Sequence, residues 1–248
     1  MNKIIIDKKI VSNSNDIKID ENVITFLKNG DYEIEYIASG EYNLSFVING
    51  DINILESSFD KELNINNRYI INKGKLNVTK FYDNKVVKEV INIDLCNKGA
   101  SVNYKFANIC KTEENYIINI NHNDEKTVSD INNKSVALVN SSLKFVINSN
   151  VLEKANGSIL NQTTRIVTMG ECDTSISPNM FIPIDDVEAR HGSVVGTFKD
   201  DQIFYLMSKG ISYKDTLKLL VKGYLLSNML LYHEIRKKII DLVDTYWR

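Results

Sequence analysis

Apolar and polar residues alternate along most of this chain, from about residue 20 to residue 195. The alternation is clear at Tyr32, Ile34 and Tyr36, where polar residues stand between the apolar ones. A period of two is typical of short β-strands that each bury one face. Polar turn segments, such as 49–51, separate these strands. The pattern therefore predicts a mainly β core built from many short strands.

Many short strands at fairly even spacing can form a sandwich, a barrel or a β-solenoid, and periodicity alone does not distinguish these folds. The sequence contains no strict internal repeat. A parallel solenoid whose coils differ in length would give this loose recurrence, with side chains stacked in ladders between adjacent coils.

The apolar period changes at Lys199, where the first helical pattern begins. Asp200 and Asp201 offer N-cap side chains for this helix, and Gly210 is placed to end it. We therefore expect a helix that contains Ile203, Phe204, Leu206 and Met207 and ends at Gly210.

Two further helices are expected in the C-terminal part. Ser212-Tyr213-Lys214-Asp215 resembles a capping box that opens the second helix, which we expect Gly223 to break or bend. A third helix is expected from about Ser227 to Tyr246, where apolar residues recur at helical spacing. The sequence thus predicts two regions: a β-rich core with a short N-terminal lead-in, residues 1–198, and a helical region, residues 199–248.

Charge and hydropathy exclude several classes of partner. With 30 basic and 32 acidic side chains interspersed and a formal net charge of −2, the chain has no basic stripe for binding nucleic acid. No apolar run approaches the length of a membrane span, and Ile4–Ile6 is too short for the core of a signal peptide. No Gly-x-x-x-x-Gly-Lys-Ser/Thr motif is present, so we expect no nucleotide to be bound by this chain itself.

The cysteines fit a reducing compartment. There are three of them, Cys96, Cys110 and Cys172, and they are far apart in sequence. They form neither a disulfide framework nor a paired Cys-x-x-Cys metal site. We therefore expect the protein to be cytoplasmic.

The densest group of titratable residues lies between the strands and the helices, from Asp185 to His191. The only two prolines of the chain, Pro178 and Pro183, come shortly before it. Because proline lacks a backbone N–H, the strand that leads to this group should be an edge strand or an interrupted one.

Two motifs in this part of the chain resemble the SufB/SufD family, whose members assemble iron–sulfur clusters. They are Asp185-Asp186-Val187-Glu188-Ala189-Arg190-His191-Gly192 and Asp201-Gln202-Ile203-Phe204-Tyr205-Leu206-Met207-Ser208-Lys209-Gly210-Ile211. The resemblance is dense over residues 160–225 and weaker over the strands before them. It implies a right-handed parallel β-helix core that pairs with a second SufB- or SufD-like core, either a copy of itself or a paralogue. It also implies a C-terminal helical region that docks the ABC-type ATPase SufC.

The resemblance carries over only some of the family's functional residues. His191 falls on a histidine associated with cluster assembly at the core–core interface. Two family cysteines are replaced here, by Ala189 and by Thr163. Cys172 lies near another cysteine position of SufB-like members. Since thiolate and imidazole are ligands of iron–sulfur sites, the candidate ligands of a transient cluster are His191 and Cys172, with Glu188 as a further donor.

The same resemblance assigns two candidate contact surfaces. The candidate SufC-docking residues are Phe204, Tyr205, Ser208, Lys209 and Gly210. The candidate core–core interface residues are Asp185, Asp186, Val187 and Arg190.

Three functional hypotheses remain open. The chain is a scaffold subunit that supplies cluster ligands but is not itself an enzyme, ATP hydrolysis being left to SufC. Alternatively it is a purely structural partner, which the replacements at Ala189 and Thr163 favour. A β-helix polysaccharide lyase or hydrolase is a third hypothesis, with the Asp185–His191 group as acid, base and charge stabiliser; the lone Trp247 argues against it, because it leaves no indole platform for a sugar.

Each candidate site residue also has a purely structural interpretation. His191 can be satisfied by neighbouring carboxylates, and Cys172 can be a small buried hydrophobe. His122 and His233 are expected to be structural or solvated. The apolar stripe of the helical region can arise from packing alone.

Overall fold

The computed structural model describes residues 2–7, 9–227 and 233–247 of the protein. The strands are β1 (Asn2–Ile6), β2 (Ile10–Ser12), β3 (Ile17–Asp20), β4 (Val23–Phe26), β5 (Gly30–Tyr36), β6 (Gly40–Tyr42), β7 (Ser45–Ile48), β8 (Ile52–Phe59), β9 (Glu62–Ile71), β10 (Lys75–Asp83), β11 (Val86–Leu95), β12 (Ser101–Cys110), β13 (Glu113–His122), β14 (Val128–Ala137), β15 (Ser142–Val151), β16 (Ser158–Thr168), β17 (Asp173–Phe181) and β18 (Val187–Gly196). The helices are α1 (Asp200–Ser208), α2 (Tyr213–Leu226) and α3 (His233–Tyr246).

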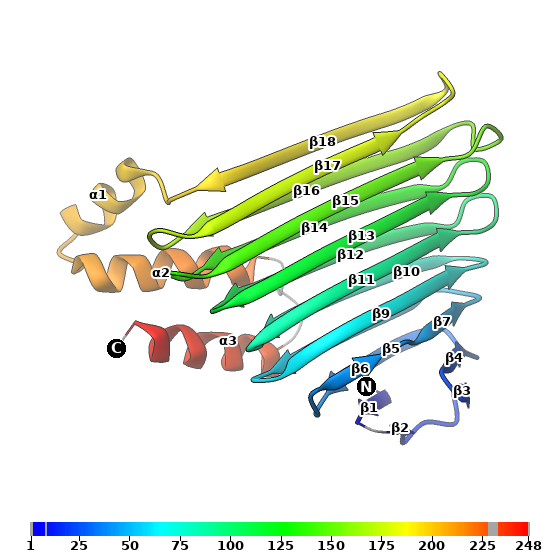
Figure 1. Ribbon diagram of the computed structural model, residues 1–248, viewed down its shortest axis with the longest axis horizontal. Coiled ribbons are helices and arrows are strands. Elements are labelled where there is room, and N and C mark those ends of the chain that lie inside the picture. Colours follow the sequence, from blue (N-terminus) through cyan, green and yellow to red (C-terminus); the bar gives the residue numbers. More distant parts are fainter. Residues whose placement is uncertain (1, 8, 228–232, 248) are drawn as a thin grey trace.

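The strands form two facing sheets that the chain visits alternately. Sheet A has the order β18-β16-β14-β12-β10-β8-β5-β1-β2, and sheet B has the order β17-β15-β13-β11-β9-β7-β4-β3, with β6 paired to β9. Pairing is parallel except in the N-terminal hairpins β1–β2 and β3–β4. Each successive pair of strands is therefore one coil of a parallel β-solenoid of about seven turns (Figure 1). This confirms the predicted β-helix core followed by a helical region.

Alternation within each strand separates the interior of the solenoid from its surface. The inward residues stack from coil to coil, as in the aromatic group of Phe106, Tyr116 and Phe145. The rings of Tyr116 and Phe145 are stacked with centroids 5.0 Å apart, and Phe106 lies edge-on to Tyr116 at 4.9 Å. Burying one such side chain stabilises the fold by about 1.5–3 kcal/mol, so the ladders account for much of the core.

An ionic group lies inside the solenoid. Lys80 is fully buried, and its Nζ lies 3.1 Å from Glu56 Oε1 and also contacts Glu89 Oε1. The hydroxyl groups of Tyr69 and Tyr82 donate to the Glu56 carboxylate at 3.0 and 2.6 Å. The group is thus held by charge pairing and by hydrogen bonds between neighbouring coils.

The helices α2 and α3 pack on the outer face of sheet A, near the ends of its strands (Figure 1). Their buried residues, including Val221 and Ile239, meet outward apolar residues of the sheet such as Phe81. The contact is secured at its edge by the Tyr246 hydroxyl, which lies 2.8 Å from Oδ1 of the buried Asp83. The helical region therefore has a fixed position on the solenoid.

The structure tests the predicted helix boundaries. The N-cap of α1 is Lys199, without a side-chain cap, so the prediction that Asp200 and Asp201 cap this helix is wrong. The predicted Ser212 cap is confirmed, since the Ser212 side chain accepts from the Asp215 N–H. Gly223 lies within a continuous α2, so the predicted break is also wrong. Packing of α2 on the sheet outweighs the low helix propensity of one glycine.

Part of the predicted start of the third helix, after Ser227, lies outside the described residues, and α3 is described from His233. The expected edge strand is confirmed, because Pro178 belongs to β17, the last strand of sheet B. Within the described parts of the chain, no helix is both long and apolar enough to cross a membrane.

Candidate functional site

The last coil of the solenoid carries the candidate site. It consists of β17 and β18, which form the C-terminal edges of sheets B and A (Figure 1). Neither strand has a further strand beside it among the described residues, so one side of each backbone has no ladder partner. Such edges are templates for pairing with another chain.

The side chains of β18 point alternately into and out of the solenoid. His191 is in register with the buried Gln162, so it faces the interior side at the open end of the coil. Glu188 and Arg190 are in register with outward residues of β16, so they face the solvent side of sheet A. Since successive side chains of a strand alternate between faces, His191 and Glu188 lie on opposite faces of β18.

Cys172 lies at the other end of the coil, in the turn between β16 and β17. Its thiol is within 3.1 Å of the Leu138 carbonyl oxygen and 3.4 Å of the Gly170 carbonyl oxygen. Gln162, which is in register with His191, donates through Nε2 to Ser149 Oγ and to the Asn179 carbonyl oxygen on β17. Asn179 is therefore the residue of β17 that lies level with His191 along the strand direction. At about 3.3 Å per residue, Cys172 is displaced from that level by roughly 20 Å.

The three candidate ligands are therefore not brought together within one chain. The described residues also contain no group of three or more His, Cys, Asp or Glu side chains that could hold a metal ion. A cluster at His191 would need its other ligands from sulfide or from a second chain. His191 and Glu188 are three residues apart in a strand, so the sequence alone already placed their side chains on opposite faces. The distance between His191 and Cys172, in contrast, depends on the length of the coil.

The candidate interface residues lie at the turn into β18. The backbone of Asp186 accepts a hydrogen bond from Gly157 N at 2.7 Å, and Val187 packs on the small apolar cluster around Leu160. Arg190 Nη2 lies 4.0 Å from Glu188 Oε2, and both side chains are largely exposed. An exposed pair of this kind contributes little to stability, so both charges remain accessible to a partner.

Sequence reasoning missed the exposed apolar residues of the last coil. Phe181 at the end of β17 and Val194 and Val195 in β18 are 58%, 54% and 45% exposed. Exposed apolar residues beside unpaired strand edges are typical of an interaction surface. The sequence signal was the apolar pair Val194-Val195 at the end of the last strand before the helical region.

The helix α1 projects from the body of the protein beyond the end of the strands (Figure 1). None of its residues is buried, and Phe204 and Tyr205 are 76% and 61% exposed. The Ser208 hydroxyl donates to the Tyr205 carbonyl at 2.7 Å, and Lys209 Nζ lies 5.5 Å from the Tyr205 ring centroid. Gly210 follows with a φ of +86°, a left-handed conformation that favours glycine. Packing within the protein therefore does not account for Phe204.

The remaining histidine and cysteine sites in the core are structural. His122 is buried between the hydroxyls of Thr127 and Ser129, at 2.8 and 2.9 Å, and burial lowers its pKa to about 4. Cys110 is buried, and burial raises the pKa of its thiol. Neither residue contributes to the candidate site.

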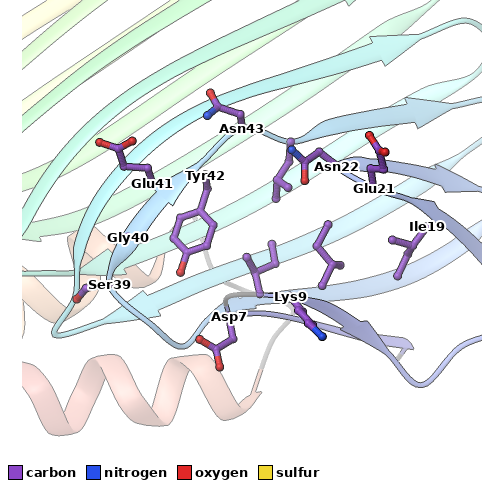
Figure 2. A pocket seen from close by; sticks show the side chains of 13 residues that line it. Asp7, Lys9, Ile19, Glu21, Asn22, Ser39, Gly40, Glu41, Tyr42 and Asn43 are labelled. Carbon is purple, nitrogen blue, oxygen red and sulfur yellow. The ribbon is translucent and has the colours of Figure 1, made fainter.

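A hollow of about 640 Å³ lies at the opposite, N-terminal end of the solenoid. Figure 2 shows Asp7, Glu21, Glu41 and Tyr42 around it. The Tyr42 hydroxyl donates to the Ala38 carbonyl at 2.8 Å. Sequence reasoning did not detect this hollow, because its residues come from four separate short strands and turns.

The fold and its exposed end define a class of protein: a parallel β-solenoid whose last strands have open edges and to which a helical region is attached. The family follows from the sequence of that same region. The SUF system FeS cluster assembly, SufBD core domain, matches residues 54–224, and the chain belongs to this family.

Individual relatives agree with the family. Over 71 residues the chain is 35% identical to the iron–sulfur cluster assembly protein SufD of Escherichia coli, covering 29% of this chain and 16% of that protein. Over 94 residues it is 30% identical to SufD of Bacillus subtilis, covering 37% and 21%. A SufBD family protein of Mycobacterium leprae is 34% identical over 70 residues, covering 27% and 18%. The chain thus spans about a fifth of the length of the curated relatives it matches.

Proposed function

We propose that this protein is a scaffold subunit of an iron–sulfur cluster assembly complex and not an enzyme in its own right. In this proposal it works in the cytoplasm, pairs with a second SufB- or SufD-like core through β17 and β18, and docks a SufC-type ATPase through α1. The cluster is its cargo and is held transiently. Family membership and the unpaired last coil support this function. The polysaccharide lyase hypothesis has no comparable support.

The observation that carries the proposal is the position of His191. It lies on an edge strand, faces the open end of the solenoid and is exposed. A second core that pairs with β18 would cover this end and bring its own residues to the imidazole. The core–core interface would include Asp185, Asp186, Val187 and Arg190, together with the exposed Val194 and Val195.

His191→Ala should remove most of the cluster from the assembled complex. The measurement is anaerobic co-purification with SufC and the partner core, reconstitution with iron and sulfide, and a visible absorption spectrum. His233→Ala is the matched control, because His233 is exposed at the start of α3. We expect a severalfold loss of cluster absorption in His191→Ala and none in His233→Ala.

Cys172→Ser decides whether the thiol takes part as a second ligand. A loss of absorption in that variant would assign Cys172 to the cluster, through a partner that reaches the far end of the coil. Unchanged absorption in both His191→Ala and Cys172→Ser would mean that this chain is a purely structural partner.

Phe204→Ala should weaken SufC binding about tenfold or more, because large exposed aromatic side chains dominate the energy of many interfaces. Phe181→Ala is a matched control, since Phe181 is also exposed but lies at the opposite end of the last coil. Affinity is measured by titrating purified SufC and following heat release. Equal weakening by the two variants, or none by Phe204→Ala, would exclude α1 as the docking element.

A further inference from the structure

Three basic residues meet on the outer face of sheet A, beside α2. They are Lys105 on β12, Lys134 on β14 and Arg165 on β16, and we call them the basic cluster. Lys134 and Arg165 are in direct register on adjacent strands. Lys105 is in register with Asn132, two residues before Lys134. With strands about 4.8 Å apart, the three side chains lie within reach of a single small ligand.

None of the three residues of the basic cluster forms an ion pair with any described residue. Asp130 lies on the same outer face of β14, in register with Asn103. Some other lysines of the solenoid do have such partners: Lys144 Nζ and Lys98 Nζ lie 3.1 and 2.6 Å from carboxylate oxygens of Asp173 and Glu125. Like charges on neighbouring strand positions repel one another, and an anion between them would remove that cost.

Helix α2 holds two of the cations in place. Lys134 Nζ contacts Ser227 Oγ at 2.5 Å. The ring of Tyr224 lies 5.7 Å from Lys134 Nζ and 5.5 Å from Arg165 Cζ, and its hydroxyl donates to the Arg165 carbonyl at 2.6 Å. Both side chains are half-buried, and Lys105 is exposed. Burial, followed by the charges of Arg165 and Lys105, lowers the pKa of Lys134, which agrees with three cations close together.

A polar hollow of about 380 Å³ adjoins the basic cluster and shares Lys105 with it. Its other lining residues include Asp31, Asn77, Thr79 and Asn103, so one carboxylate also borders the hollow. The side chain of Asn77 donates to Asn53 Oδ1 at 2.7 Å, whereas Asn103 Oδ1 is buried and has no hydrogen-bond partner. A buried acceptor of this kind costs free energy unless a donor reaches it. The hollow therefore offers an acceptor and a hydroxyl beside a site of positive charge.

We infer that the basic cluster and this hollow form a binding site for a small phosphorylated ligand that carries hydroxyl groups, of the sugar phosphate class. The phosphate lies between Lys105, Lys134 and Arg165, where an arginine can hold two of its oxygens. A hydroxyl of the ligand donates to Asn103 Oδ1. Arg165 adjoins Val194 of β18, but no residue of the site belongs to β17, β18 or α1, so the inference does not depend on the function proposed above.

The test is calorimetric titration of the purified full chain at low ionic strength, where charge pairing is least screened. The probes are ribose 5-phosphate, inorganic phosphate and ribose. We expect ribose 5-phosphate to bind more tightly than inorganic phosphate, and ribose not to bind. Lys105→Gln, Lys134→Gln and Arg165→Gln should each lower the affinity about tenfold or more.

Two further variants make the experiment specific. Asn103→Ala should abolish the preference for ribose 5-phosphate over inorganic phosphate and leave phosphate binding intact. Lys144→Gln, on the outer face of sheet B, is the charge-matched control and should leave all affinities unchanged. Lys105 is exposed, so its variant remains informative if Arg165→Gln fails to fold.

Three outcomes would overturn the inference. One is the absence of binding by ribose 5-phosphate at millimolar concentration. Another is equal weakening by Lys144→Gln, which would indicate non-specific attraction. The third is tighter, cluster-dependent binding of a polyglutamate peptide, which would make this surface a contact for an acidic protein.

Discussion

Lys80→Met should lower the free energy of unfolding by about 3–5 kcal/mol. Among the described residues, Lys80 is the only cation paired with the buried carboxylates of Glu56 and Glu89, and the substitution removes it. Burial raises the pKa of Glu89 to about 7, against the opposing effect of Lys80. Without Lys80, these carboxylates must either stay charged in the interior or take up protons, and both alternatives destabilise the fold.

Urea unfolding followed by circular dichroism measures this effect. Lys98→Met is the control, because Lys98 and Glu125 form a largely exposed pair that contributes about 0–1 kcal/mol. Combining Lys80→Met with Glu56→Gln and Glu89→Gln should recover much of the loss, since the uncompensated charges are then gone. A loss below about 1 kcal/mol in Lys80→Met would contradict the buried ionic group as described.

Glu114→Gln should raise the free energy of unfolding at pH 8 by about 1–3 kcal/mol. Glu114 is fully buried, and burial raises its pKa from 4.5 to about 8, although hydrogen bonds from Tyr116 and Asn108 act in the opposite direction. The folded protein therefore binds this proton more tightly than the unfolded chain does. Stability contributed by the proton is complete below pH 4.5 and is lost as the pH rises toward 8.

Glutamine does not titrate, so the variant should lack this part of the pH dependence. Its amide oxygen can accept from Tyr116, and its NH₂ replaces Glu114 Oε1, which has no partner. We expect wild type and Glu114→Gln to have similar stability near pH 4 and to diverge above it. The measurement is a series of urea unfolding curves from pH 4 to pH 8.

The neighbouring Glu113 provides the control for this series. It is exposed and faces away from the interior, so Glu113→Gln should leave the slope of stability against pH unchanged. Parallel curves for wild type and Glu114→Gln would show that the buried carboxyl does not hold its proton in the folded state.

The candidate site was only partly predictable. The motifs around His191 and Phe204 indicated the last coil and α1 as the candidate region, and the prolines correctly predicted an edge strand at β17. Sequence reasoning nevertheless grouped His191 with Cys172, which the register separates along the coil. It also attributed Phe204 to packing as one interpretation, whereas this side chain is exposed on α1.

Local chemistry explains what the sequence determined by itself. The alternation of apolar residues specifies which side of each strand is buried, because the side-chain period of a strand is two. The serine cap of α2 was likewise readable, because Ser212 and Asp215 contact each other within one turn. Neither property depends on distant parts of the chain.

Only the tertiary structure decided which residues meet across coils. Lys105, Lys134 and Arg165 lie on three strands, and Asp83 and Tyr246 are 163 residues apart in the sequence. Their proximity depends on the register between coils and on where α2 and α3 pack. Because the coils differ in length and the sequence has no strict repeat, no fixed spacing encodes these contacts. They arise only when every coil is stacked on the one before it.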